Sequence, residues 1–142
     1  MSLSPTQRTL RALREQGRIA AIVEKWNAHA GPFGIRQDLF GIVDVLALDP
    51  VRGFVGVQSC GQAFAAHYRK LTEEKAQESL DWMRTPGGVL ELWSWRKVKA
   101  KRGGKALVWR ARVHTFTVED ITDRKDGPEM GGVMVRDDGG EP

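Results

Sequence analysis

Apolar residues form two kinds of pattern along this chain, and each kind predicts strands. Residues 39–48 and 53–59 are mostly apolar and are separated by a short turn, which predicts two adjacent buried strands joined as a hairpin. Residues 89–95 predict a strand, because Leu90, Leu92 and Ser94 alternate with Glu91, Trp93 and Trp95. Residues 106–117 predict the next strand. A basic, glycine-containing turn at residues 101–105 would join this second pair as another hairpin.

Helical signals occur before and between these strand pairs. Ser4 is a favourable cap, a proline follows at the first helical position and Gln7 completes a capping box, so a helix is expected to reach about residue 16. Residues 62–84 predict a longer helical segment, in one piece or in two pieces broken near Thr72. Apolar positions along this segment can face a core.

The element order then suggests a fold class. Residues 19–26 fit either a strand or one face of a helix, and residues 27–37 predict a loop because they contain glycine and proline. If residues 19–26 form a strand, the order predicts an α+β domain with a central mixed β-sheet flanked by helices. This domain is expected to span residues 1–118, followed by an acidic, glycine-rich, flexible tail at residues 119–142.

Polar side chains interrupt the first apolar hairpin at one place in each strand. Asp44 stands within the first run and Gln58 stands near the end of the second. Burying a carboxylate is costly unless it is paired or binds a metal, so Asp44 is a candidate site residue. A structural ion pair of Asp44 with Arg36 or Lys70 is the alternative, and Gln58 could simply bond to neighbouring backbone.

Composition adds a cellular expectation. The chain has 142 residues, enough for one domain, and it contains no apolar run long enough to span a membrane. Its first residues lack the layout of a signal peptide, and a single cysteine, Cys60, cannot form an internal disulfide. We therefore expect a cytoplasmic protein, in which Cys60 is a small buried residue.

Charge is distributed unevenly along the chain. The formal net charge is +4, yet eight Lys and Arg residues and no acid lie between residues 96 and 112. Such a strip predicts contacts with phosphates of DNA, which do not depend on base sequence. The alternative is a solvated edge hairpin that its lysines protect from aggregation. The candidate nucleic-acid-binding residues are Arg96, Lys97, Lys99, Lys101, Arg102 and Lys105.

The order of elements, with an aspartate in the second strand and a polar group in the third, resembles the PD-(D/E)XK nuclease superfamily. This superfamily includes archaeal Holliday-junction resolvases and restriction endonucleases. The chain is also similar to a group of small uncharacterised bacterial and phage proteins of this type, over residues 5–112. The segments that carry this similarity are Glu24–Asn27, Arg36–Asp44, Val57–Gln58, Arg69–Leu71 and Trp93–Lys97.

This resemblance implies a Mg²⁺- or Mn²⁺-dependent endonuclease that hydrolyses phosphodiester bonds of DNA. Asp44 matches the aspartate of the motif, whereas Gln58 stands in place of the second acid and Cys60 in place of the lysine. Lys70 on the following helix is expected to replace that lysine, and Asp38 or Glu24 to supply the missing carboxylate. The expected catalytic residues are Asp44, Gln58 and Lys70, and the expected metal ligands are Asp44, Gln58, Asp38 and Glu24.

The two departures from the motif keep other functions open. One is a nuclease-fold protein that binds DNA without catalysis, and another is a protein-interaction module such as a phage accessory protein. The resemblance also implies a homodimer, because nucleases of this fold often dimerise. Three tryptophans alternate along the second hairpin, and they favour packing on the sheet over stacking with bases: Trp93, Trp95 and Trp109.

Overall fold

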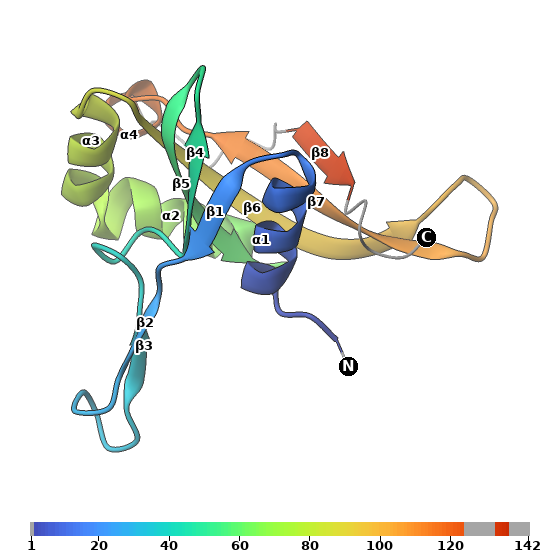
Figure 1. Ribbon diagram of the computed structural model, residues 1–142, viewed down its shortest axis with the longest axis horizontal. Helices are drawn as coiled ribbons and strands as arrows, with labels where there is room; N and C mark the ends of the chain where they lie inside the picture. Colours follow the sequence, from blue (N-terminus) through green and yellow to red (C-terminus); the bar gives the residue numbers. More distant parts are fainter. Residues whose placement is uncertain (1, 124–132, 137–142) are drawn as a thin grey trace.

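The computed structural model describes residues 2–123 and 133–136, the latter as backbone only. Within these residues, six strands form a mixed sheet with helices on both faces (Figure 1). The strands β5 and β6 run parallel, and their other neighbours pair antiparallel. In order across the sheet, the strands are β1 (Ile19–Ile22), β4 (Val45–Asp49), β5 (Gly53–Cys60), β6 (Gly88–Lys99), β7 (Leu107–Thr115) and β8 (Val133–Arg136). The predicted α+β class, with a mixed central sheet flanked by helices, is confirmed.

Alternation along the central strands separates two hydrophobic clusters in the described part of the chain. Val57 and Trp95 face the helix α1 (Pro5–Glu15), which covers one side of the sheet. Leu90 and Leu92 face the other side, where the segment from Phe64 to Leu71 packs. Successive side chains of a strand point to opposite faces, so one strand contributes to both clusters. The burial of Trp93 and Trp95 in the first cluster confirms that they pack on the sheet.

Local sequence signals position α1 as predicted. The hydroxyl of Ser4 accepts from Gln7 N–H, and the Gln7 side chain accepts in return from Ser4 N–H, which completes the capping box. The helix is then pinned to the sheet by the Thr9 hydroxyl, which accepts hydrogen bonds from Ser59 Oγ at 2.8 Å and from Trp95 Nε1 at 2.9 Å. A buried hydroxyl thus fixes α1 against the end of β5.

The second helical segment is broken near Thr72, as the sequence indicates. It consists of α2 (Phe64–Arg69), a π-helical turn (Lys70–Glu74) and α3 (Ala76–Arg84). The turn is closed by a hydrogen bond from Lys75 N–H to Lys70 O at 2.7 Å. Single π-helical turns are often found at functional sites, and Lys70 begins this one.

The strand predicted over residues 39–48 is shorter in the structure. Only Val45–Asp49 forms a strand, β4, whereas residues 39–43 form a tight turn closed by a bridge between Leu39 and Val43. Phe40 and Gly41 adopt positive φ angles of 55° and 75° in this turn. The turn buries Ile42 and Val43 completely, so its apolar residues mimic the pattern of a buried strand.

A small hairpin occupies most of the predicted loop. Of residues 19–26, which fit either a strand or a helix, residues 19–22 form the strand β1. Two further strands, β2 (Lys25–Asn27) and β3 (Ile35–Gln37), pair with each other outside the main sheet. Figure 1 shows this hairpin projecting from the body of the molecule. The loop prediction is therefore wrong at both ends of residues 27–37.

The chain continues past the predicted end of the domain. Two pieces of the predicted tail have secondary structure: α4 (Glu119–Thr122) and β8, which pairs with β7. Asp120 accepts hydrogen bonds from the Tyr68 hydroxyl at 2.9 Å and from Thr117 N–H at 2.7 Å. The other residues of the predicted tail, 124–132 and 137–142, lie outside the described residues. In the described ranges, no helix has the length and apolar character needed to cross a membrane.

Candidate functional site

Asp44 lies in the sheet immediately before β4. Its backbone N–H donates to Val57 O at 2.8 Å and its carbonyl accepts from Val23 N–H at 2.8 Å, which fixes the main chain on both sides. The residue is 5% exposed. Its Oδ2 accepts a hydrogen bond from Ser59 N–H at 2.8 Å. The prediction that Asp44 is a buried carboxylate is confirmed, although it sits just outside the strand.

Three carboxylates meet at this point, and we call them the acidic cluster: Glu24, Asp38 and Asp44. One oxygen of each lies within 4.8 Å of the others, among the residues that the structure describes. Glu24 directly precedes β2 and Asp38 directly follows β3, so the two roots of the projecting hairpin bring these acids to Asp44. Carboxylate oxygens are the ligands that Mg²⁺ and Mn²⁺ prefer. The donor set therefore fits a hard divalent cation.

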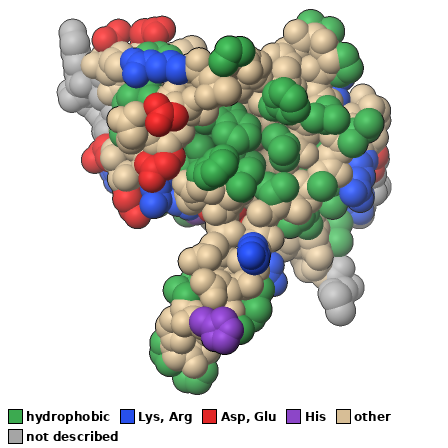
Figure 2. Space-filling model, turned by 60° about the vertical axis from the view of Figure 1, so that its left-hand side comes forward, with side chains coloured by type: hydrophobic (Ala, Val, Ile, Leu, Met, Phe, Trp, Pro, Cys, Tyr) green, Lys and Arg blue, Asp and Glu red, His purple; other side chains and the backbone are tan. Residues whose placement is uncertain are grey.

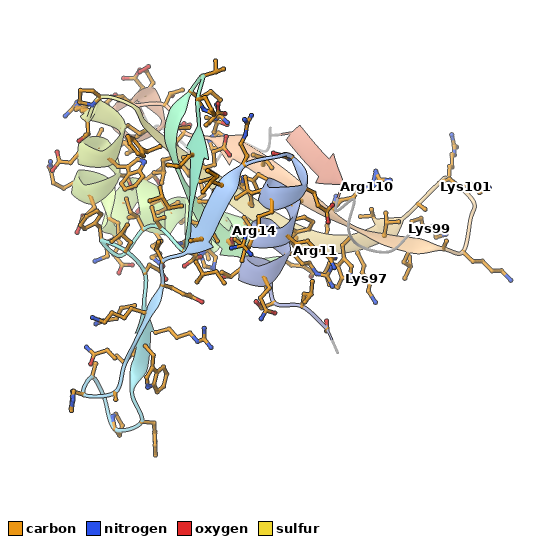
Figure 3. The ribbon with its side chains drawn as sticks, viewed as in Figure 1. Arg11, Arg14, Lys97, Lys99, Lys101 and Arg110 are labelled. Carbon is orange, nitrogen blue, oxygen red and sulfur yellow. The ribbon has the colours of Figure 1, made fainter. Side chains whose placement is uncertain are left out.

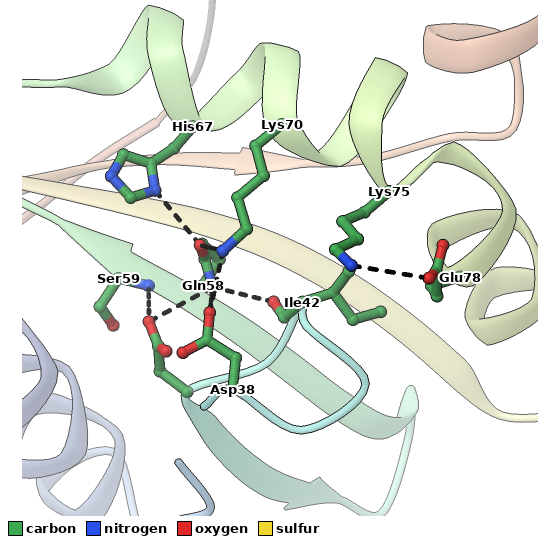
Figure 4. A network of polar contacts seen from close by, with 9 residues as sticks. Asp38, Ile42, Gln58, Ser59, His67, Lys70, Lys75 and Glu78 are labelled. Atoms are coloured by element: carbon green, nitrogen blue, oxygen red, sulfur yellow. Dashed lines mark hydrogen bonds and ion pairs between the residues drawn. The ribbon is translucent and has the colours of Figure 1, made fainter. Parts of the chain in front are cut away.

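Gln58 links two members of the acidic cluster, Asp38 and Asp44, through its side-chain amide (Figure 4). Its Nε2 donates to Asp38 Oδ2 at 3.0 Å and to Ile42 O at 3.0 Å, and lies 3.4 Å from Asp44 Oδ2. Because a backbone carbonyl can only accept, Ile42 fixes which end of the amide faces the acids. The Gln58 oxygen, expected as a metal ligand, instead accepts from Lys70 Nζ at 2.9 Å. In this geometry Gln58 positions the carboxylates rather than adding an oxygen to them.

Lys70 reaches the site from the first residue of the π-helical turn. Its Nζ lies 3.0 Å from Asp38 Oδ2, so the predicted approach of this helix lysine to the acids is confirmed. His67, one helical turn earlier, contacts Gln58 Oε1 through Nδ1 at 3.2 Å. Burial, together with the charge of Lys70, lowers the pKa of His67 below its usual value. Sequence reasoning missed His67, although its spacing of three residues from Lys70 places both on one helix face.

The electrostatics of the cluster separate its two aspartates. Burial, reinforced by the neighbouring Asp38 carboxyl, raises the pKa of Asp44 to about 8. Burial also opposes ionisation of Asp38, but hydrogen bonds with Asp44, Gln58 and Lys70 outweigh it and leave the pKa of Asp38 below 3.8. At neutral pH, Asp44 therefore holds a proton that a bound cation would displace.

The cations that the sequence offered as partners of Asp44 pair with other acids. Arg36 Nη1 lies 3.0 Å from Glu24 Oε1, and Lys70 pairs with Asp38. Asp44 accepts instead from the Ser59 backbone amide and the Gln58 side chain. Each member of the acidic cluster thus has a different kind of partner, and the most buried one depends on neutral donors.

Cys60 is buried, as predicted, and belongs to the hydrophobic cluster beneath α2. Burial raises the pKa of its thiol to about 11, which keeps it protonated and unreactive at neutral pH. It stands where the resemblance places a lysine. The positive charge of the site comes instead from Lys70, which approaches from the helix rather than from β5.

The candidate DNA-binding residues lie on the β6–β7 hairpin. We call its basic end, residues 96–110, the basic arm, and Figure 3 shows it extending beyond α1. Antiparallel pairing puts Arg96 opposite Arg110 and Lys97 opposite Trp109. At its start the arm is anchored to α1, because Arg8 of α1 stacks 3.9 Å from the Trp109 ring centroid. All six predicted residues are exposed: Arg96, Lys97, Lys99, Lys101, Arg102 and Lys105.

Comparison with known proteins identifies no relative of this chain. No protein-family model matches the chain, and no curated protein or solved structure matches it significantly. The fold and the site therefore define the class: a small α+β domain with an acidic cluster at one end of β4 and a basic arm on β6–β7. The resemblance to the PD-(D/E)XK superfamily stays a prediction.

Proposed function

We propose that this protein is a divalent-metal-dependent endonuclease that hydrolyses phosphodiester bonds of DNA, with a site of the PD-(D/E)XK type. The observation that carries the proposal is the convergence of Glu24, Asp38 and Asp44, whose oxygens lie within 4.8 Å of one another beside a lysine. A cation held by carboxylates, with a nearby positive charge, is one arrangement that catalyses hydrolysis of a phosphodiester. Mg²⁺ and Mn²⁺ are the expected ions.

Each residue of the site has a distinct part in this reaction. The acidic cluster would hold the cation, which when bound polarises the phosphate and lowers the pKa of a bound water. Lys70 carries its ammonium group at the edge of the cluster, where it can stabilise charge on the phosphate. Gln58 and Ser59 N–H hold Asp38 and Asp44 in place by the hydrogen bonds described above. Asp44 would give up its proton in order to hold the cation.

The basic arm supports DNA as the substrate. Its exposed cations lie on β6 and on the turn that follows it, where they can track a phosphate backbone. Contacts of this kind position a duplex without reading its sequence. The exposed lysines also protect the free end of the hairpin, so DNA binding needs a direct test.

A DNA-binding protein without catalysis is the second candidate. It is favoured by Gln58, which turns an amide nitrogen rather than a carboxylate toward the acids, and by a cysteine at the position of the usual lysine. The acidic cluster would then have a structural role or hold a cation without cutting. The two candidates make the same prediction for DNA affinity and opposite predictions for hydrolysis.

The test is cleavage of supercoiled plasmid and of branched DNA in Mg²⁺, in Mn²⁺ and in EDTA. We expect metal-dependent cutting by the natural protein and loss of cutting in Asp44→Asn, which preserves the shape of the side chain. Glu119→Gln, an exposed acid on α4, is the matched control that retains cutting. Salt-sensitive DNA binding with no cutting in either metal would establish the second candidate, and neither binding nor cutting would overturn both.

A further inference from the structure

The projecting hairpin β2–β3, residues 25–37, is attached to the acidic cluster at both roots. We call it the finger, and Figures 1 and 2 show it standing away from the body of the molecule. Glu24 enters the finger and Asp38 leaves it, so anything bound along the finger lies next to the candidate metal ligands. The finger contributes nothing to either hydrophobic cluster beyond its roots in the described residues. Its sequence is therefore free to serve binding.

Trp26 forms a supported aromatic platform on the finger. A Cβ atom added at Gly34, where φ is +83°, would lie 2.9 Å from Cε2 of the indole, so the ring rests directly on the glycine backbone. Only glycine permits this approach. The residue nevertheless remains 57% exposed. A large ring held in place by the backbone and open to solvent is suited to stack on a flat ligand.

Arg36 connects this platform to the acidic cluster. It lies directly opposite Trp26 in the β2–β3 register, so both side chains lie on one face of the finger. Its side chain is 72% exposed and its Nη1 lies 3.0 Å from Glu24 Oε1. One face of the finger therefore presents an aromatic ring, then a guanidinium group, then the candidate metal ligands.

The charge of the finger complements a nucleic-acid backbone. Residues 25–37 include Lys25 and Arg36 but no acid. Arginine beside an aromatic ring is the combination that binds a single strand, with the guanidinium on phosphate and the ring on a base. Within a duplex, both faces of each base are covered by its neighbours. A base must therefore be unpaired or terminal to stack on Trp26.

We propose that the finger binds a single-stranded segment of DNA next to the acidic cluster, with Trp26 stacked on a base and Arg36 on the adjoining phosphate. The inference rests on the proposed function and deepens it, because it makes the preferred substrate a duplex with a single-stranded tail rather than an uninterrupted duplex. When Arg36 turns to a phosphate, it releases Glu24 from their ion pair. Strand binding and completion of the metal-ligand set are thereby coupled.

The test measures binding to fluorescein-labelled single-stranded, tailed-duplex and blunt-duplex DNA by anisotropy in EDTA. We expect tighter binding of tailed than of blunt DNA, and Trp26→Ala to weaken the tailed and single-stranded complexes about tenfold but the blunt complex much less, because only its terminal bases can stack on the ring. Trp26→Phe restores part of the loss. Ile35→Ala is the matched control, because it removes an exposed apolar side chain from the opposite face of the finger.

The outcomes separate this inference from the proposed function. Equal affinity for tailed and blunt DNA, or equal loss in Trp26→Ala and Ile35→Ala, would overturn the finger as a strand-binding element and leave it as a surface for a protein partner. Metal-dependent cutting that is lost in Asp44→Asn would survive that result. Conversely, strand binding that depends on Trp26 in a protein that never cuts would retain the inference and reject the nuclease.

Discussion

Acids lie at both ends of β4, and the two ends hold them in opposite ways. Asp49, the last residue of the strand, accepts hydrogen bonds through Oδ1 from Val51 N–H at 2.9 Å and from Arg52 N–H at 3.1 Å. Its Oδ2 lies 3.3 Å from Arg18. The backbone hydrogen bond from Val51, helped by the others and by the arginines, lowers the pKa of Asp49. Asp44, at the other end, has its pKa raised to about 8.

We call the Asp49 end of β4 the balanced end, and Arg52 links it to a further buried acid, Glu91 on β6. Its carboxylate accepts from Trp93 Nε1 at 3.0 Å and from Thr115 Oγ1 at 2.8 Å, and it forms an ion pair with Arg52. Asp49 and Glu91 are as buried as Asp44. Burial of an acid therefore does not mark a site in this protein. The acidic cluster differs because Asp44, its most buried member, accepts hydrogen bonds only from neutral donors and lies beside a second carboxyl, that of Asp38.

The largest expected effect is on metal binding. Asp44→Asn should lower the affinity for Mn²⁺ by at least about 10²-fold, because changes outside the ligand shell alone already cost up to that much. Asp49→Asn, at the balanced end of the same strand, should leave the affinity unchanged. Isothermal titration calorimetry of both variants measures this difference. If the two substitutions weaken Mn²⁺ binding alike, the distinction between the two ends of β4 disappears.

The balanced end should matter more for stability. Glu91→Gln is expected to lower the free energy of unfolding by about 2 kcal/mol, since it removes the carboxylate that pairs with Arg52 and places an amide nitrogen against either the Trp93 donor or the Thr115 donor. Asp44→Asn should leave that free energy nearly unchanged at neutral pH in EDTA, because the neutral amide replaces an acid whose raised pKa keeps it protonated there. Urea unfolding of the two variants gives the comparison. A large loss of stability in Asp44→Asn alone would make Asp44 the structural acid.

A smaller effect follows from the proton on Asp44. The unfolded chain ionises Asp44 near pKa 3.8, whereas the folded protein keeps the proton up to a pKa of about 8. The folded state thus binds more protons between these values, and the free energy of unfolding falls as pH rises. His67, whose pKa is lowered by burial from 6.5, acts oppositely below that pH. The window between about pH 6.5 and pH 8 therefore isolates Asp44.

Within this window, the loss of stability in EDTA should approach about 1.4 kcal/mol per pH unit. Asp44→Asn should flatten the slope, and saturating Mn²⁺ should do the same in the natural protein by replacing the proton. Denaturant midpoints across a pH series measure both effects. A slope that persists in Asp44→Asn would assign the titration to another group.

The sequence predicts the parts of this arrangement that local patterns encode. The cap at Ser4, the break in the second helical segment and the burial of Asp44 all follow from spacing along the chain. The acidic cluster does not follow from spacing, because Glu24 and Asp38 meet through the pairing of β2 with β3, in a segment whose glycines and proline predict a loop. Only the resemblance names these two acids as ligands beside Asp44, and the structure brings all three together. The orientation of the Gln58 amide depends on Ile42 O, which the tight turn at Phe40 and Gly41 directs toward Gln58. Long-range pairing and a positive φ decide the site, and neither leaves a periodic signal.

The cations of the molecule divide in the same way as its acids, and this gives the smallest predicted effect. Arg18 and Arg52 neutralise Asp49 and Glu91 within the fold, whereas the lysines of the basic arm are exposed. Replacing Lys99 and Lys101 by glutamine should reduce the slope of log K for duplex binding against log salt by about 0.9 for each phosphate that the arm no longer neutralises. Arg18→Gln should leave that slope unchanged, because Arg18 forms an ion pair with Asp49 rather than facing DNA phosphates. Binding titrations at several salt concentrations distinguish the lysine variant from Arg18→Gln. Equal slopes in all variants would show that the lysines of the arm do not contact DNA and only protect the end of the hairpin from aggregation.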